Sequence, residues 1–257
     1  MRDPGLSEAI RTAGGVGELA RQIGISQPSV SNWTRVPAER VISVEAVTGV
    51  DRAVLRPDLY GRQMAGDIEE VDAARAQEYA LLATLLTRAP DAALLAKLSK
   101  LRADASPLGL AHAALAEAAE RATVEGVERE LFDLFIGVGR GELLPYGSYY
   151  LTGFLHERPL ARLREDMARI GIARAEGVVE PEDHAGILCE IMSGIASRRL
   201  PTPRGSDQLI FDKHMMPWIG RFFADLENSE AANFYKSVGA LGRVFMDIEA
   251  QAFELPG

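Results

Sequence analysis

Apolar residues recur along this chain at the three- and four-residue spacing of amphipathic helices. Leu188, Ile191 and Met192 follow this spacing in the second half. A longer stripe near the C-terminus is formed by Phe234, Val238, Leu241, Phe245 and Ile248. No stretch alternates apolar and polar residues in the manner of a strand, and no Asn-Gly or Asp-Gly pair marks a hairpin. The pattern therefore predicts an all-α fold.

The helical pattern breaks near residue 62. Pro57 ends a helical stretch, and several glycines and polar residues with little apolar periodicity follow it. Residues 1–62 carry eight arginines, no lysine and seven acidic residues, a net charge of +1, whereas the remainder carries 20 basic and 30 acidic residues, a net charge of −10. We therefore predict an N-terminal domain at 1–62, a linker at 63–67 and a larger domain at 68–257.

The composition is that of a globular protein of 257 residues, with 47% hydrophobic and 25% charged side chains. The net charge of −9 argues against a protein that coats nucleic acid, since such proteins need surplus cations. The apolar run Tyr79–Leu86 is far shorter than the about 20 residues of a membrane span, so we expect no membrane insertion. The chain begins without the apolar region of a signal peptide, which predicts a cytoplasmic location.

Cys189 is the only cysteine, which excludes an internal disulfide and every site that needs several cysteines for zinc or an iron–sulfur cluster. We expect no metal site and no cofactor.

A helix, a turn and a second helix are predicted between residues 15 and 35. Glu18–Ile23 have helical spacing, Gly24 suits the turn, and Ser26 and Pro28 suit the first positions of the second helix. With Ile25, Val30 and Trp33 facing inward, the polar residues of the second helix face outward. This is the layout of a helix-turn-helix, whose second helix enters the major groove of DNA.

The outward residues have the side chains that read DNA. Gln and Asn can form paired hydrogen bonds with adenine, and an arginine can bind a phosphate. The predicted DNA-binding residues are Gln27, Ser29, Ser31, Asn32 and Arg35.

The stretch from Leu6 to Tyr60 resembles the Cro/YdaS-type helix-turn-helix of phage-derived repressors and antitoxins. The resemblance implies DNA binding, with dimerisation needed for tight binding. A small helical domain that kept this fold for docking to a protein is the alternative, and the charge of only +1 is in its favour.

Six aromatic residues gather between Phe132 and Phe154, around the glycine-rich stretch GVGRGELLPYGSYYLTG at 137–153. The phenylalanines lie on a helical stripe and are predicted to be in the core. Tyr146 and Tyr149 are equally compatible with a core and with a binding groove. The glycines follow a helix rather than a strand and lack the Lys-Ser/Thr of a phosphate-binding loop, so they predict no nucleotide site.

The second notable motif is EPEDH at 180–184. Pro181 is predicted as the first residue of a helix that reaches Ala196, with Glu182 in its acidic first turn. Asp183 and His184 are adjacent and point in different directions on such a helix, so they make no catalytic pair. The chain lacks an HExxH zinc motif and a nucleophile elbow. We therefore predict no catalytic residues and no enzymatic activity.

These pieces together resemble the TorD/DmsD family, cytoplasmic chaperones of molybdenum-containing redox enzymes that are exported by the twin-arginine route. The resemblance rests on ELFDLFIGVGRGELLPYGSYYLTG (130–153), EPEDH (180–184) and FDKHMMPWIGRFFADL (211–226). It implies an all-helical fold that binds the signal peptide of a client enzyme. By position, the implied binding residues are Tyr146, Gly147, Ser148, Tyr149, Pro181, Asp183, His184 and, less closely matched, Trp218. The chain departs from the family at Tyr146, which is often tryptophan in relatives, and in its N-terminal domain.

The chemistry of a twin-arginine leader agrees with this implication. Carboxylates can hold guanidinium groups by paired hydrogen bonds, and Glu180 and Asp183 are the candidates. His184 is expected to titrate near neutrality and to make peptide binding depend on pH.

Two functions follow as hypotheses. The first is a chaperone for a molybdenum-containing redox enzyme, bound through its twin-arginine signal peptide. The alternative is a transcription regulator whose larger domain senses the client or its signal peptide. Operator DNA and a second copy of the chain, in a homodimer, are the further partners considered.

Overall fold

The computed structural model describes residues 2–60, 63–174, 177 and 179–254. These residues form helices, turns and loops without any strand, which confirms the all-α prediction. The chain divides into two compact units, Met1–Asp72 and Ala73–Gly257. The residues predicted as a linker, 63–67, lie in the first turns of α7 (Gln63–Thr87), which continues past the division between the units.

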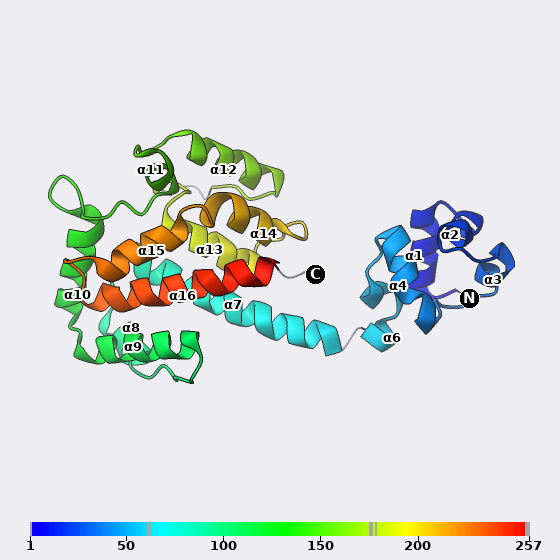
Figure 1. Ribbon diagram of the computed structural model, residues 1–257, viewed down its shortest axis with the longest axis horizontal. Helices are drawn as coiled ribbons and strands as arrows, with labels where there is room; N and C mark the ends of the chain where they lie inside the picture. Colours follow the sequence, from blue (N-terminus) through cyan, green and yellow to red (C-terminus); the bar gives the residue numbers. More distant parts are fainter. Residues whose placement is uncertain (1, 61–62, 175–176, 178, 255–257) are drawn as a thin grey trace. The chain divides into compact units, whose positions relative to one another are not determined.

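The smaller unit is a bundle of short helices around its own apolar core (Figure 1). Its elements are α1 (Pro4–Ala13), α2 (Val16–Gln22), α3 (Gln27–Ser31), the 3-10 turn η1 (Ala38–Arg40), α4 (Val41–Thr48), α5 (Arg52–Leu55) and α6 (Pro57–Tyr60). The helix-turn-helix expected here is α2 and α3. Gly24 lies between them in the left-handed conformation (φ 70°) that favours glycine.

The inward-facing residues predicted for the smaller unit are confirmed, and the predicted cap of α3 differs in one hydrogen bond. Val30 is buried in the core, and Ile25 and Trp33 pack against it. Ser26 occupies the N-cap position of α3, but its hydroxyl bonds the hydroxyl of Ser29 at 2.7 Å instead of a backbone N–H.

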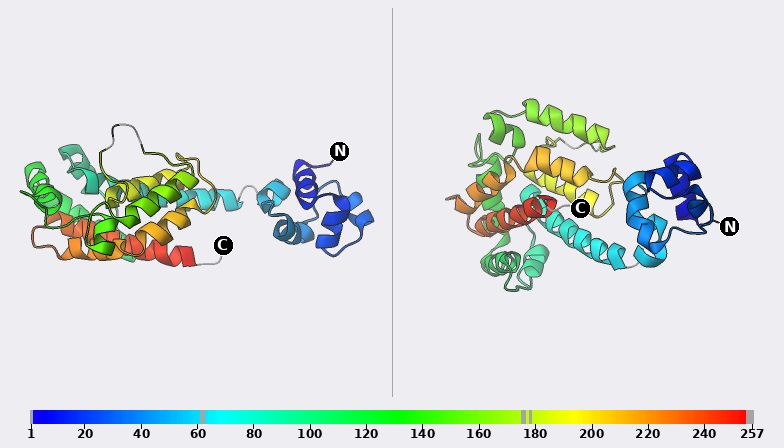
Figure 2. Two further views of the ribbon diagram at one scale, coloured as in Figure 1. Left: turned by 90° about the horizontal axis from the view of Figure 1, so that it is seen from above. Right: turned by 45° about the vertical axis from the view of Figure 1, so that its right-hand side comes forward.

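The larger unit is a body of packed helices (Figure 2). After α7 its elements are α8 (Ala92–Leu98), α9 (Pro107–Arg121), α10 (Val124–Leu131), the π-helix η2 (Phe132–Ile136), α11 (Gly147–Thr152), α12 (Arg158–Arg169), α13 (Ala185–Ala196), α14 (Ser206–Ile210), the π-helix η3 (Phe211–Met215), α15 (Ile219–Asn228) and α16 (Phe234–Glu254). Helix α13 lies in the core, and the apolar stripe predicted near the C-terminus is buried along α16 apart from its last member, Ile248.

Helices α15 and α16 pack closely side by side (Figure 1). Two glycines of α16 make this contact possible. A Cβ on Gly242 would lie 2.2 Å from the Phe223 ring, and one on Gly239 would lie 2.4 Å from the backbone N of Glu227. Any side chain at either position would push the two helices apart.

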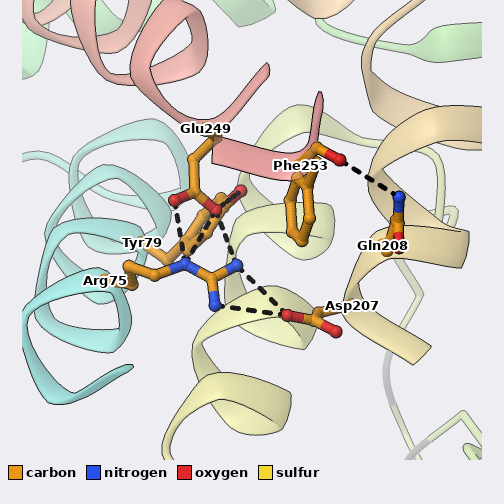
Figure 3. A network of polar contacts seen from close by, with 6 residues as sticks. All are labelled: Arg75, Tyr79, Asp207, Gln208, Glu249 and Phe253. Carbon is orange, nitrogen blue, oxygen red and sulfur yellow. Dashed lines mark hydrogen bonds and ion pairs between the residues drawn. The ribbon is translucent and has the colours of Figure 1, made fainter. Parts of the chain in front are cut away.

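A partly buried ion network joins three helices of the larger unit (Figure 3). The guanidinium of Arg75 on α7 bonds both carboxylate oxygens of Glu249 on α16, and its terminal nitrogens lie 3.2 Å from Asp207 on α14. The Tyr79 hydroxyl donates to Glu249 at 3.0 Å. The buried carboxylate of Glu249 is therefore paired and hydrogen-bonded, as a charge in a protein interior must be.

Cys189 lies within α13, and its side chain is fully buried. Burial raises the pKa of its thiol far above the ordinary value, so the thiolate is suppressed. Among the described residues, no helix is both long enough and apolar enough to cross a membrane.

Candidate functional site

The two segments singled out in the sequence, around Tyr146 and at 180–184, lie against each other in the larger unit. An isolated antiparallel bridge pairs Tyr146 with His184. The Gly147 N–H donates to the Asp183 carbonyl at 2.9 Å, and the Ala185 N–H donates to the Pro145 carbonyl at 2.7 Å. The start of α11 is thereby joined to the start of α13.

Side chains reinforce this joint. The Tyr146 hydroxyl donates to Glu180 Oε1 at 2.5 Å, and the Tyr146 ring meets the His184 ring edge-on with centroids 5.2 Å apart. Burial, together with the neighbouring Glu180 carboxylate, raises the pKa of Tyr146 above its ordinary value. The Tyr146 hydroxyl and the Glu180 carboxylate therefore satisfy each other's need for a hydrogen-bond partner.

Asp183 is buried, with 3% of its surface exposed. Its Oδ2 accepts a hydrogen bond from the Ser148 N–H at 2.7 Å, whereas its Oδ1 and the Ser148 hydroxyl have no hydrogen-bond partner among the described residues. An unsatisfied buried carboxylate oxygen is costly to keep, and such an atom needs an explanation.

The prediction that Pro181 begins the following helix is wrong. Helix α13 begins at Ala185, and His184 is its N-cap, accepting the Gly186 N–H at Nδ1 over 3.0 Å. Residues 181–184 form a turn instead, in which the His184 N–H donates to the Pro181 carbonyl at 3.1 Å. No acidic residue lies in the first turn of α13.

The expectation that His184 titrates near neutrality is also corrected. Burial lowers the pKa of His184, although the carboxylates of Glu180 and Asp183 act in the opposite direction. The hydrogen bond that Nδ1 accepts also requires this nitrogen to carry no proton. His184 is therefore neutral at pH 7.

Glu182, predicted only as a residue of a helix start, is buried and forms an ion pair with a half-exposed arginine. Its carboxylate lies 2.7 Å from Arg164 of α12, and Arg174 lies at 4.0 Å. Burial acts to raise the pKa of Glu182, but the hydrogen bond from Arg164, a backbone hydrogen bond and the charges of Arg164 and Arg174 together lower it. Glu182 thus fastens the 180–184 turn to α12.

A cavity of about 490 Å³ lies beside Asp183, between α11, α12 and η3. Its volume is in the range of ligand-binding pockets. It is lined by Gly147, Leu151, Pro159, Arg162, Leu163, Glu165, Asp166, Arg169, Asp183, Asp212, Lys213, His214, Pro217 and Trp218.

Three predicted residues meet at this cavity: Gly147, Asp183 and Trp218. Trp218 is 2% exposed, and its indole N–H donates to the His214 carbonyl at 2.7 Å. A Cβ on Gly147 would lie 2.9 Å from the indole nitrogen, so the glycine is what lets the tryptophan pack against α11.

The other predicted residues lie elsewhere. Tyr146, Ser148, Glu180, Pro181 and His184 form the joint beside the cavity without lining it. Tyr149 lines a separate depression of about 390 Å³, where its hydroxyl bonds Arg140, whose guanidinium lies 5.1 Å from the ring centroid.

The aromatic stretch contributes less to the core than the sequence suggests. Phe135 packs against the core, but Phe132 is 41% exposed and Phe154 is 69% exposed. Leu151 and Leu155 are exposed on the same corner between α11 and α12. Apolar side chains therefore stand on the surface next to the cavity.

A charged cluster at the cavity was missed by the sequence reasoning. Asp166 of α12 is buried and accepts hydrogen bonds from His214 at 3.0 Å and Arg169 at 2.7 Å, with Lys213 at 3.5 Å. Burial acts to raise the pKa of Asp166, but His214 and Lys213 together lower it. The one available signal was the stretch FDKHMMPW, in which three consecutive polar residues, 212–214, follow an apolar run.

The smaller unit exposes every residue predicted to bind DNA: Gln27, Ser29, Ser31, Asn32 and Arg35. Its arginines are largely engaged within the unit. Arg35 lies 3.3 Å from Asp58, and Arg11 and Arg21 pair with glutamates of their own helices. The surface of α3 is therefore polar rather than cationic.

Two family models match the chain. The nitrate reductase delta subunit model matches residues 101–224, and the bacterial toxin YdaS model matches residues 6–64. The cavity and the joint at 146–184 lie within the first match, and α2 and α3 lie within the second.

Curated relatives are described as chaperone protein TorD. The protein from Vibrio atlanticus is 25% identical over 46% of this chain and 60% of its own length, and that from Vibrio cholerae is 25% identical over 44% and 56%. The chain thus spans about three fifths of these two relatives. The protein from Shewanella loihica is 22% identical over 70% of this chain and 92% of its own length.

A solved structure from Archaeoglobus fulgidus, described as a redox enzyme maturation protein, is 19% identical with a TM-score of 0.46, over 67% of this chain and 93% of its own. From the sequence matches, the chain is a fusion of a helical region similar to TorD chaperones, matched by the nitrate reductase delta subunit family, and a helix-turn-helix region matched by the YdaS family.

Proposed function

We propose that this protein is a non-enzymatic cytoplasmic chaperone that binds the twin-arginine signal peptide of a molybdenum-containing oxidoreductase and assists its maturation before export. The observation that carries the proposal is Asp183, a buried residue that lines the cavity and whose carboxylate Oδ1 has no partner among the described residues. A guanidinium group supplies the hydrogen bonds that such an oxygen lacks.

The surroundings of the cavity suit the rest of such a leader. An apolar segment follows the arginines of a twin-arginine signal, and Leu151, Phe154 and Leu155 are exposed next to the cavity. Burying a few hundred Å² of apolar surface contributes roughly several kcal/mol before the cost of ordering the peptide. The larger unit is also acidic, which steers a cationic peptide toward it.

The relatives support the chaperone class. Those reported above are described as TorD chaperones, and the nitrate reductase delta subunit model matches the part of the chain that holds the cavity. We extend to this chain the role of binding a redox enzyme precursor before export.

Calorimetric titration with leader peptides of candidate client enzymes tests the proposal. We expect binding with a dissociation constant of about micromolar or tighter. Asp183→Asn should weaken it, because the amide still accepts the Ser148 N–H but turns a donor toward the incoming guanidinium. Asp247→Asn, an exposed change on α16, is the matched control. An absence of binding to any leader, or equal affinities for the two variants, contradicts the proposal.

The smaller unit supports a second candidate, a transcription regulator in which the larger unit senses client or signal peptide. The supporting observation is that α3 exposes all its predicted base-contacting residues. A dimer would provide two such helices for two half-sites.

Gel-shift titration of operator fragments with and without leader peptide tests this candidate. Peptide should change operator affinity, and DNA should change peptide affinity by the same factor. A Gln27→Ala, Asn32→Ala double variant should lose DNA binding and keep peptide binding. Identical titration curves with and without peptide exclude the sensor role.

A further inference from the structure

We propose that Glu165 and Asp212 are the residues that select arginine at this site, each binding one guanidinium of the leader peptide, with Asp183 at the buried end of the cavity. This inference rests on the proposed chaperone function. It replaces Glu180, which the sequence favoured together with Asp183, because Glu180 accepts the Tyr146 hydroxyl and does not line the cavity.

Part of the charge around the cavity is already paired. Asp166 is surrounded by Arg169, Lys213 and His214 at 2.7, 3.5 and 3.0 Å. Burial lowers the pKa of His214, so this histidine is neutral at pH 7. The two cations and the one carboxylate leave one positive charge, which the other carboxylates of the cavity must outweigh to bind a cationic ligand.

Two carboxylates at the cavity remain unpaired. Glu165 and Asp212 line the same cavity and are exposed, and neither carboxylate has an ion pair or side-chain hydrogen bond among the described residues. They come from different elements, α12 and η3. Exposed carboxylates alone indicate nothing specific, but here they share a cavity with the buried, unpartnered Oδ1 of Asp183.

The backbone around Asp212 has an unusual conformation. Residues 211–215 form a π-helix, and three consecutive side chains of this turn, from Asp212 to His214, line the cavity. A π-helical turn is uncommon and is often found at functional sites. In this chain it supplies one free carboxylate together with two of the groups that surround Asp166.

Part of the cavity wall is apolar. Leu163, Pro217 and Trp218 contribute to the cavity wall. The methylene stem of an arginine can pack on such a surface while its head reaches a carboxylate. The planar guanidinium matches a carboxylate by two parallel hydrogen bonds, which lysine cannot do, so the site should prefer two arginines over two lysines.

A further cation opposes this arrangement. Arg162 lines the cavity, lies three residues before Glu165 on α12, and has no ion pair among the described residues. Its charge repels an incoming guanidinium, so removing it should strengthen binding of the leader.

The test compares a leader containing Arg-Arg with the same peptide containing Lys-Lys, by calorimetry on the full chain. Wild-type protein should bind the Arg-Arg peptide about tenfold or more tightly than the Lys-Lys peptide. The Glu165→Gln, Asp212→Asn double variant should lose about tenfold or more in affinity for Arg-Arg and most of the discrimination. Arg162→Gln should bind Arg-Arg more tightly than wild type.

The control is Glu128→Gln, Asp247→Asn, which makes the same change of net charge at exposed positions outside the cavity. Thermal unfolding of each variant checks that the fold is kept. If wild type binds the leader and the cavity variant binds and discriminates equally well, this inference is overturned and the chaperone proposal stands. Equal losses in the cavity variant and the control also overturn it, since general charge then explains the effect. No binding by wild type overturns the chaperone proposal itself.

Discussion

At the scale of single residues, His184 holds a helix end and a motif together. Its Nδ1 accepts the Gly186 N–H at the start of α13, and its ring packs against Tyr146. Both contacts use the neutral imidazole, and burial lowers the pKa of the ring. The residue that resembles a pH switch in sequence is therefore a structural residue at pH 7.

This role predicts a dependence of stability on pH. In the unfolded chain a histidine has a pKa of about 6.5, above that of buried His184, so the unfolded state binds more protons as the pH falls below that value. The contribution of His184 to the free energy of unfolding is thus complete above about pH 6.5 and is lost as the pH falls toward its folded pKa. His184→Asn keeps an N-cap acceptor that does not titrate.

Urea unfolding at pH 7, 6 and 5 measures the effect. Between pH 7 and 5, wild type should lose more stability than His184→Asn. His112, whose pKa is raised mainly by its hydrogen bond to Glu78, and His214, whose pKa is lowered mainly by burial, are present in both proteins and cancel in the comparison. Parallel losses in the two proteins contradict the assignment.

The sequence predicted which segments form the site but not which acidic residues are paired. The resemblance identified segments that do lie together, at Tyr146 and at 180–184. The partners of the acidic residues could not be predicted from the sequence. Glu182 pairs with Arg164 and Asp166 pairs with His214, which lie 18 and 48 residues away along the chain. Only packing of α12 against its neighbours decides which carboxylates are paired and which remain free.

At the scale of elements, α16 begins on a carboxylate supplied by another helix. Glu130 of α10 accepts the N–H groups of Asn233, Phe234 and Tyr235 at 2.8, 3.2 and 3.2 Å. These are first-turn donors that have no partner within their own helix. A carboxylate at this position also interacts favourably with the positive end of the helix dipole.

Glu130→Ala should therefore lower the free energy of unfolding of the larger unit by about 1–3 kcal/mol, since hydrogen bonds to a charged group are lost. Glu130→Gln, which keeps an acceptor without the charge, should have a smaller effect. Chemical denaturation measures both. Glu128→Ala on the same helix is exposed and should change little; if it costs as much as Glu130→Ala, the capping role is wrong.

Helical periodicity predicted the elements but not their irregular ends. A π-helix follows α10 at 132–136, which shifts the side chains from the 3.6-residue period and leaves Phe132 exposed although it was expected in the core. The start of α13 was misplaced because Pro181 suits a first turn, whereas a histidine is not among the usual N-cap residues. Both errors arise where contacts between segments override the local pattern.

At the scale of the whole molecule, each unit has its own apolar core, and the two cores share no residue. The all-α class followed from the spacing of apolar residues. The start of α7 could not be predicted in this way. Its first turns have little apolar periodicity, and yet they belong to a helix of 25 residues.

Separate cores predict two unfolding transitions in differential scanning calorimetry. Leu19→Ala, in the core of the smaller unit, should destabilise that unit by about 2–5 kcal/mol and leave the other transition in place. Leu188→Ala should act on the larger unit alone. A single transition that both variants shift equally contradicts independent unfolding.

The fully buried thiol of Cys189 is a natural probe of how often the larger unit opens. An alkylating reagent attacks thiolate, so labelling must wait for the larger unit to open, and the smaller unit has no sulfhydryl to compete. The rate of mass gain in a spectrometer then counts openings of one unit without any introduced probe. A leader peptide that binds the closed form should slow the labelling of Cys189 as its occupancy rises. A peptide that does not bind should leave the labelling rate unchanged.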